Sequence, residues 1–415
     1  MRFEFIRLLK LVLSILVAFS LSGCNVVNSL RLKYANDDVL PQWNHTQTSF
    51  DLVTDYIGEK AYVYGSVNGV DGFKFMIDTG ASYTILFDTP RVKQLTLKEG
   101  YRLALSGWGD EESSPSYQTV VERLSFGKID FEHIAVAFMP VSTSRYFLRE
   151  DEVIYDGVIG YDTLRHFVWQ FDKKAERVTV FNQPYQQGKS ETLIPFDEFM
   201  GKISIDTQVD FGDKQMVDHD FIIDTGSRHY IKISATYVGN HQLRLPGTQI
   251  TAADFGLNGK TVHKRASLPV FNLGELRLED VKTNFIHTDD EDDFWVIGNA
   301  LLGQYVTTID YMQGNLYLAP YQDSEFSSRY NLLGLELRKL RNQNFVVRYV
   351  FPHSPANDRV IQVGDEVYSI NGVKAEAISH DQWLSISNTP GEYVLCFVAA
   401  SCVSLTSTEI RGYSM

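Results

Sequence analysis

Apolar and polar residues alternate over short stretches through most of the chain after residue 50, and glycine or asparagine separates many of these stretches. Residues 61–67 form one such stretch, Asn68-Gly69 follows as a turn signal, and a second stretch occupies residues 73–77. Alternation with a period of two is typical of a strand with one buried face, and Asn-Gly between two such stretches indicates a β-hairpin. We therefore predict that this part of the chain consists almost entirely of strands and turns.

The order of these stretches occurs twice. Residues 51–185 can be laid over residues 188–322, so that the hairpins, turns and apolar segments of the first copy have counterparts in the second. In both copies an apolar strand runs directly into Asp-Thr-Gly, and a later apolar pair ends in glycine before a short helical turn. These four segments are Asp78-Thr79-Gly80, Asp224-Thr225-Gly226, Val158-Ile159-Gly160 and Val296-Ile297-Gly298. A repeat of this length predicts two similar all-β lobes that bring the two aspartates together.

Charge and motif content exclude several functions. The 415 residues carry a formal net charge of −14, which argues against a nucleic-acid partner and against purely electrostatic binding to anionic lipid. The histidines show no spacing typical of zinc sites, and the Gly-x-Ser-x-Gly motif of serine hydrolases is absent. The acidic run at residues 289–293 lacks the spaced ligands and turn glycine of a calcium loop, so we interpret it as a solvated surface loop. We expect neither a metal site nor a cofactor.

Residues 1–24 combine a basic start with an apolar stretch that is too short to span a bilayer. The stretch ends in Leu21-Ser22-Gly23-Cys24, which resembles the lipobox of bacterial lipoprotein signals. The resemblance implies a signal peptide at residues 1–23, lipidation of Cys24 and a polar tether at residues 24–50. Asn25 implies an anchor in the outer membrane of the bacterial cell envelope, facing the periplasm. An ordinary cleaved leader with an incidental cysteine is the alternative.

The two Asp-Thr-Gly segments and the two Val-Ile-Gly segments, in this order and spacing, resemble those of retropepsin- and pepsin-type aspartic proteases. The resemblance implies two lobes, at residues 51–187 and 188–322, with Asp78 and Asp224 as the catalytic pair. It also implies four supporting residues in the two loops, which are Thr79, Gly80, Thr225 and Gly226. Retropepsins pair two separate chains, whereas pepsin carries both lobes in one chain, so we expect this chain to form its site as a monomer.

Each lobe of a pepsin-like protease also provides a flap hairpin. Gly107, Trp108 and Gly109 match the first flap by position, although a tryptophan between two glycines departs from the pepsin pattern. The stretch at residues 254–259 matches a second flap poorly. We expect the first flap to close over bound peptide.

The resemblance assigns a definite chemistry to the aspartate pair. Two carboxylates about 3 Å apart cannot both ionise, so they share one proton and titrate together. The charged member can take a proton from water while the protonated member polarises the peptide carbonyl, without a metal or a covalent intermediate. We therefore expect an aspartic endopeptidase that acts on peptides or unfolded proteins. The alternatives are a catalytically inactive peptide-binding lipoprotein and an envelope scaffold.

A third unit follows a polar connector at residues 321–330. It contains a Leu-Gly-Leu loop and then Ser-Pro-Ala, Gly-Asp-x-Val and Ile-Asn-Gly, and so resembles a bacterial PDZ domain, a small α+β barrel, at residues 330–412. The resemblance implies that the loop of Leu333, Gly334 and Leu335, together with an open strand edge, binds the C-terminus of another protein. The alternatives are a PDZ domain that covers the cleft and regulates access to it, and a PDZ-like fold used only for contacts with the lobes.

Two cysteines, Cys396 and Cys402, remain in the third unit after the lipidated one. They flank a short turn between two strand-like stretches, so their side chains can face each other. A disulfide and a pair of buried thiols are both compatible with this pattern in an oxidising compartment.

Overall fold

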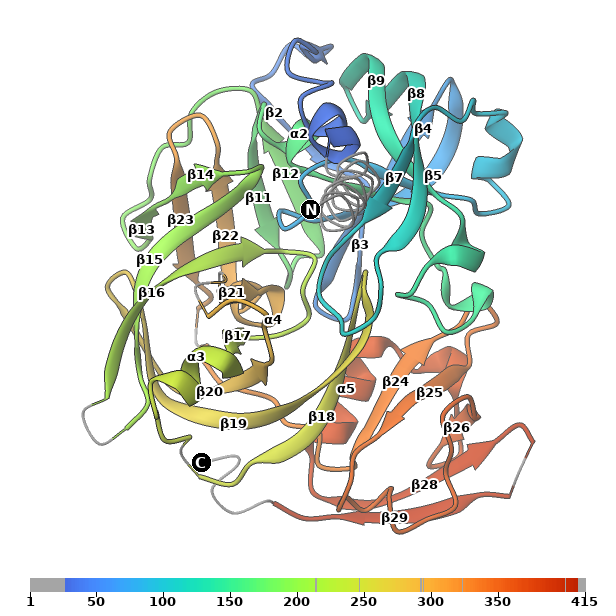
Figure 1. Ribbon diagram of the computed structural model, residues 1–415, viewed down its shortest axis with the longest axis vertical. Coiled ribbons are helices and arrows are strands. Elements are labelled where there is room, and N and C mark those ends of the chain that lie inside the picture. Colours follow the sequence, from blue (N-terminus) through green and yellow to red (C-terminus); the bar gives the residue numbers. More distant parts are fainter. Residues whose placement is uncertain are drawn as a thin grey trace, which may run out of the picture.

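The computed structural model describes residues 27–212, 215–245, 247–291, 293, 295–322, 324–399 and 401–409. Two β-rich lobes and a smaller third unit, coloured orange to red, make up the molecule (Figure 1). Cys24 and the signal segment lie outside the described residues. No helix within these ranges is long and apolar enough to cross a membrane.

The first lobe is built on a nine-stranded sheet. β5 (Val70–Ile77) leads directly into Asp78, and β10 (Gly157–Ile159) runs parallel beside it. Alternate residues of β5, among them Phe73 and Phe75, are fully buried, as the period of two predicts. The other elements are β1 (Gln42–Trp43), β3 (Thr54–Ile57), β4 (Lys60–Val67), β6 (Ile85–Phe87), η1 (Val92–Leu95), β7 (Arg102–Leu105), β8 (Ser114–Phe126), β9 (Ile129–Met139), η2 (Val141–Thr143), η3 (Glu150–Glu152) and α2 (Tyr161–Leu164).

The second lobe repeats this arrangement in an eight-stranded sheet. β16 (Met216–Asp224) leads into the second Asp-Thr-Gly loop, and β21 (Trp295–Gly298) runs parallel beside it. A further parallel pair, β6 with β9, has its counterpart in β17 with β20. The two lobes therefore share their strand pairing around the loops, as the sequence repeat predicts. The other elements are β14 (Asp197–Phe199), β15 (Lys202–Asp210), β17 (Ile231–Ser234), α3 (Ala235–Asn240), β18 (Ile250–Gly256), β19 (Gly259–Leu273), β20 (Leu276–Ile286) and α4 (Asn299–Leu302).

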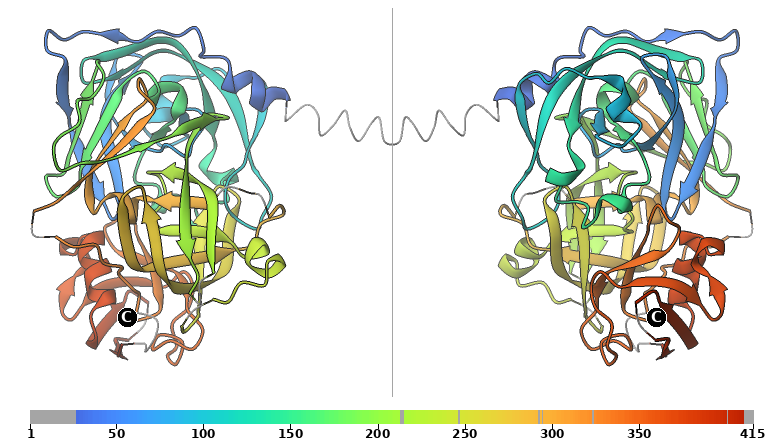
Figure 2. Two further views of the ribbon diagram at one scale, coloured as in Figure 1. Left: turned by 90° about the vertical axis from the view of Figure 1, so that its left-hand side faces the viewer. Right: turned by 90° about the vertical axis from the view of Figure 1, so that its right-hand side faces the viewer.

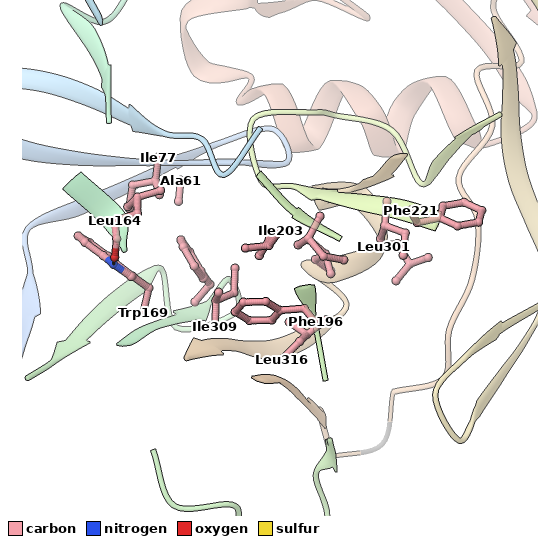
Figure 3. Close-up of a cluster of buried hydrophobic side chains, with 14 of the residues drawn as sticks. Ala61, Ile77, Leu164, Trp169, Phe196, Ile203, Phe221, Leu301, Ile309 and Leu316 are labelled. Atoms are coloured by element: carbon pink, nitrogen blue, oxygen red, sulfur yellow. Dashed lines mark hydrogen bonds between the residues drawn. The ribbon is translucent and has the colours of Figure 1, made fainter. Parts of the chain in front are cut away.

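A six-stranded sheet joins the two lobes, because the hairpins that close the two halves pair with each other. Figure 3 shows Trp169, Ile309 and Leu316 from this sheet in one apolar core that also contains Ile77 and Phe221 from the lobes. Each large apolar side chain contributes about 1.5–3 kcal/mol when fully buried, so the shared core holds the lobes together strongly. The strands in sheet order are β13 (Thr192–Pro195), β23 (Asn315–Pro320), β22 (Tyr305–Asp310), β11 (Val168–Asp172), β12 (Arg177–Phe181) and β2 (Ser49–Leu52).

Residues 27–49 pack against the first lobe, which corrects the expectation of a polar tether at residues 24–50. The buried Asn36 side chain donates to the Ala135 carbonyl at 2.8 Å and to the Asp162 carboxylate at 2.7 Å. Two strands of this region, β1 and the start of β2, pair with β9 and β12. A polar side chain that satisfies buried polar groups leaves no apolar alternation in the sequence, so the pattern could not reveal this contact.

The third unit has its own six-stranded sheet and core, with α5 (His380–Asn388) packed on it. Trp383 of α5 is buried, with its ring 6.3 Å from that of Phe345. A disulfide joins Cys396 and Cys402, which was one of the two alternatives left open by the sequence. The other elements are β24 (Leu335–Lys339), β25 (Phe345–Val350), β26 (Glu366–Ile370), β27 (Val373–Lys374), η4 (Ala375–Ala377), β28 (Gly391–Phe397) and β29 (Val403–Ser407).

The third unit packs against both lobes, as Figures 1 and 2 show from three sides. Arg149 of the first lobe forms an ion pair with Glu366 at 2.7 Å. Arg348 of β25 lies over the ring of Phe255 in β18, with the guanidinium carbon 3.5 Å from the ring centroid. Side-chain contacts therefore hold the third unit against both lobes.

Candidate active site

The two Asp-Thr-Gly loops meet where the lobes join. The Thr79 hydroxyl donates to the Ile223 carbonyl at 2.6 Å and accepts the N–H of Thr225 at 3.1 Å. The Thr225 hydroxyl makes the reciprocal contacts, with the Ile77 carbonyl at 3.0 Å and the Thr79 N–H at 3.1 Å. Both threonines are almost fully buried. Because buried hydrogen bonds are costly to break, these contacts fix the two loops relative to each other.

Gly80 and Gly226 allow the two aspartates to approach. A β-carbon at Gly80 would lie 2.7 Å from the carboxylate carbon of Asp224, and one at Gly226 would lie 2.2 Å from that of Asp78. Real β-carbons do not approach other atoms so closely, so any side chain at either glycine would displace a carboxylate. The structure therefore brings Asp78 and Asp224 together, each packed against the glycine of the opposite loop.

The environment of the pair disfavours two negative charges. Burial and the nearby Asp224 raise the pKa of Asp78 to about 7, although Lys60 and the Gly80 N–H act in the opposite direction. The Oδ1 atom of Asp224 is buried and has no hydrogen-bond partner among the described residues. A carboxyl group with such a pKa keeps its proton at mildly acidic pH, so the pair can hold one proton between them.

The two Val-Ile-Gly segments lie directly behind the loops. The Asp78 N–H donates to the Ile159 carbonyl at 3.1 Å. A β-carbon at Gly160 would lie 2.5 Å from the Tyr83 carbonyl oxygen, and one at Gly298 would lie 2.2 Å from that of His229. Glycine is therefore required at both positions, because the main chain of each loop passes within contact distance.

The predicted flap residues lie over the cavity, joined to the second lobe. The Trp108 carbonyl accepts the N–H of Asn258 at 3.0 Å, and the Gly107 N–H donates to the Asn258 side chain at 3.1 Å. A β-carbon at Gly109 would overlap the Asn258 main chain. Asn258 lies in the turn between β18 and β19, in the stretch that matched a second flap poorly. Residues of both turns line the cavity, among them Gly107, Trp108 and Leu257.

The dyad opens into a cavity of about 510 Å³. Its wall includes the dyad, Trp108 of the flap, Glu336 and Arg338 of β24, and His380 of α5. A PDZ domain adds a peptide strand to an exposed sheet edge, and β24 lies at the edge of the sheet of the third unit. Residues of β24 and α5 line the same cavity as the dyad.

The predicted PDZ loop differs from expectation in one respect. The side chains of Leu333 and Leu335 are fully buried, and the Gly334 N–H donates to the Asn331 side chain at 2.9 Å. A β-carbon at Gly334 would lie 2.1 Å from the Ser354 side chain, and the φ of Gly334 is +77°. This N–H is therefore already engaged and does not provide the free donor that we expected for a terminal carboxylate.

Nine lysine and arginine residues line the cavity, and none of them belongs to the site expected from the sequence. Five of them are Lys60, Arg228, Lys232, Arg338 and Arg348. Only one of them carries a visible sequence signal, because Lys232 interrupts the short, fully buried strand β17. A charged residue in a buried strand indicates a polar interior, but nothing in the sequence places the third unit against the lobes.

The acidic run at residues 289–293 follows β20, and its described members are Asp289, Asp290, Glu291 and Asp293. Three of them are exposed. Across the described parts of the chain, no group of three or more His, Cys, Asp or Glu side chains is placed to hold a metal ion.

Comparison with known proteins gives two matches to family models. Residues 63–163 match the aspartyl protease family, and residues 324–398 match the PDZ domain. The search of curated proteins found no match. The solved structures that match include the aspartic proteinase from Irpex lacteus, at 14% identity and a TM-score of 0.40, over 66% of this chain and 98% of that one.

The predicted fold class, two all-β lobes of aspartic-protease type with a PDZ domain, is confirmed. The chain thus combines a region similar to aspartyl proteases with a C-terminal PDZ domain.

Proposed function

We propose that the protein is an aspartic endopeptidase in which Asp78 and Asp224 act as the catalytic pair. The observation that carries the proposal is the reciprocal contact of the two Asp-Thr-Gly loops, in which Thr79 and Thr225 each bind the main chain of the opposite loop. A loop used only as a structural turn needs no such partner, whereas a shared proton requires two carboxylates at fixed separation.

The mechanism follows from the raised pKa of Asp78. The protonated carboxyl donates a hydrogen bond to the carbonyl oxygen of the scissile bond, while the ionised one accepts a proton from the water that attacks. The proton held by the first carboxyl and the proton taken from water are then available for the carbonyl oxygen and the leaving amine. No metal or covalent intermediate enters these steps.

Substrate entry requires movement of the flaps. The hydrogen bonds of Gly107 and Trp108 with Asn258 join two turns that line the cavity, and we expect them to open when a peptide chain enters. Closure after binding would exclude water from the site and strengthen the electrostatic interactions within it.

The proposal is tested by digestion of a peptide library with the chain from residue 25 onward, beside Asp78→Asn and the control Asp71→Asn. Asp71 lies in the exposed first part of β5 and does not line the cavity. The expected result is cleavage by the wild type and by Asp71→Asn, with none by Asp78→Asn. Cleavage by all three proteins would contradict the proposal. Absence of cleavage in every case, with retained peptide binding, would favour a catalytically inactive peptide-binding protein.

We also propose that the protein is anchored in the bacterial cell envelope through a lipid on Cys24. The Leu21-Ser22-Gly23-Cys24 motif supports the anchor, and the Cys396–Cys402 disulfide is compatible with an oxidising compartment. Metabolic labelling with a fatty acid is expected to label the wild type and to fail with Cys24→Ser. Equal labelling of both proteins would exclude this site of attachment.

A further inference from the structure

The wall of the cavity has a charge opposite to that of the whole chain. Nine lysine and arginine residues line it, against six aspartates and glutamates that include the dyad. The chain as a whole carries a net charge of −14. Since the two members of the dyad share a proton, the cavity has an excess of positive charge, which favours an anionic ligand over a cationic one.

Lys232 is the clearest case of a cation without a protein counter-ion. Its side chain is buried, with the residue 5% exposed, and its ammonium lies 5.0 Å from the centroid of the Trp108 ring. Among the described residues it forms no ion pair with a carboxylate. Burial lowers the pKa of Lys232, whereas the charges of Asp254 and Asp224 act in the opposite direction. A buried charge without an ion pair is costly, so an anion bound beside this ammonium would stabilise it.

Two further cations on the lobes also form no ion pair with a carboxylate among the described residues. Lys60 at the start of β4 is 5% exposed, and its ammonium contacts the hydroxyl of Tyr146 at 3.4 Å. Arg228 directly follows the second Asp-Thr-Gly-Ser segment, and its Nε atom is buried without a hydrogen-bond partner among the described residues. Both line the same cavity as Lys232, so three cations of the lobes share the cavity with the dyad.

The third unit adds two guanidinium groups to this side of the cavity. Arg338 donates to the Tyr146 hydroxyl at 2.8 Å, and both Arg338 and Arg348 pair with the buried Glu152, at 3.5 and 3.3 Å. A single carboxylate thus serves two guanidinium groups. Burial raises the pKa of Tyr146, but Arg338 and Lys60 outweigh it and lower that pKa to about 6. The local field therefore favours negative charge.

We propose that Lys60, Arg228, Lys232 and Arg338 form a subsite that binds a carboxylate of the substrate beside the scissile bond. The inference rests on the proposed protease function for its substrate. A carboxylate suits the subsite because it fills the counter-ion position at Lys232 and can accept two N–H groups from one guanidinium. Its source is either an aspartate or glutamate side chain or the C-terminus of the substrate, since β24 and α5 of the PDZ domain line the same cavity.

The test uses paired peptides and the Asp78→Asn variant, so that binding is measured without hydrolysis. In the first pair both peptides have an amidated C-terminus, and they differ only in carrying Glu or Gln at one position. In the second pair neither peptide has an acidic side chain, and they differ only in having a free or an amidated C-terminus. The anionic member of at least one pair is expected to bind roughly tenfold more tightly, with the advantage decreasing as salt is added. The pair that shows the preference identifies the source of the carboxylate.

Three substitutions in the Asp78→Asn background complete the test. Lys232→Met should abolish the preference, Lys232→Arg should retain most of it, and the exposed Lys128→Met should leave it unchanged. Removing an unpaired buried charge should not lower the melting temperature. If Lys232→Met is nevertheless unstable, Lys60→Met provides the same comparison.

Equal affinity for both members of both pairs, or an equal loss of preference in Lys232→Met and Lys128→Met, would overturn the subsite. The outcome is distinguishable from failure of the proposed function, which is judged by hydrolysis with the wild type. A preference in binding without any hydrolysis would retain the subsite and reject the protease. Hydrolysis by the wild type without any binding preference would retain the protease and reject the subsite.

Discussion

Asp78 lies where burial and a facing carboxylate oppose its ionisation. Its raised pKa of about 7 means that the folded chain keeps a proton that the unfolded chain releases at lower pH. The stability contributed by this proton is fully present below about pH 4 and is lost as the pH rises through about 7. The same titration governs catalysis in the proposed mechanism, because the dyad needs one shared proton.

The first expected outcome concerns this titration. Asp78→Asn removes the ionisable group, so its stability relative to the wild type should increase as the pH rises from about 4 to about 8. The midpoint of urea unfolding, measured at several pH values, checks the change. A difference that stays constant with pH would show that Asp78 has an ordinary pKa.

A second outcome concerns Gly80. In Gly80→Ala the new β-carbon would meet the Asp224 carboxylate, so hydrolysis should be lost, with an overpacking cost of about 1–3 kcal/mol in stability. Gly239→Ala in α3 is the matched control, because nothing lies within 4 Å of its β-carbon. Full activity in Gly80→Ala would show that the carboxylates are not held against the glycines.

At the scale of elements, the strands of the two lobes can be predicted from the sequence more fully than the contacts between the turns that line the cavity. Alternating strands and the Asp-Thr-Gly and Val-Ile-Gly segments predict the sheets that position Asp78 and Asp224, because periodicity follows directly from burial on one face. The contact between Trp108 and Asn258 could not be predicted, because turn residues carry no period and meet only after both lobes have folded. The packing of residues 27–49 could not be predicted for a similar reason, because it depends on polar contacts that leave no periodic pattern in the sequence.

The third outcome concerns the flap. Trp108→Ala should lower kcat/KM by roughly tenfold or more, since the ring packs over the cavity and beside Lys232. Steady-state kinetics with several peptides measure the effect. Trp43→Ala, on a strand away from the cavity, provides a comparison for a general loss of aromatic packing. Unchanged kinetics in Trp108→Ala would remove the flap from the mechanism.

At the scale of the whole molecule, the third unit completes the cavity. Its motifs predict the PDZ fold, but its position depends on contacts between distant charged residues, such as Arg149 with Glu366 and Arg338 with Glu152. Each of these residues resembles an ordinary surface charge in the sequence. The assembly of the cavity from three units is therefore visible only in the structure.

The fourth outcome concerns this assembly. A chain that ends at residue 322 should keep both lobes folded through the β11–β22 pairing, yet cleave even short peptides more slowly, because the cavity loses Arg338 and Arg348. Kinetics on one short peptide, with circular dichroism as the folding control, provide the measurement. Faster cleavage by the shortened chain would instead identify the third unit as a cover over the site.

The most direct measurement of the central claim is the rate of peptide hydrolysis by Asp78→Asn, Asp224→Asn and the double variant, with thermal melts to show that each protein is folded. Because the two carboxylates act as one unit, each single substitution should reduce the rate to the level of the double variant, without additivity. Wild-type turnover in either single variant would contradict a catalytic dyad formed by the two lobes.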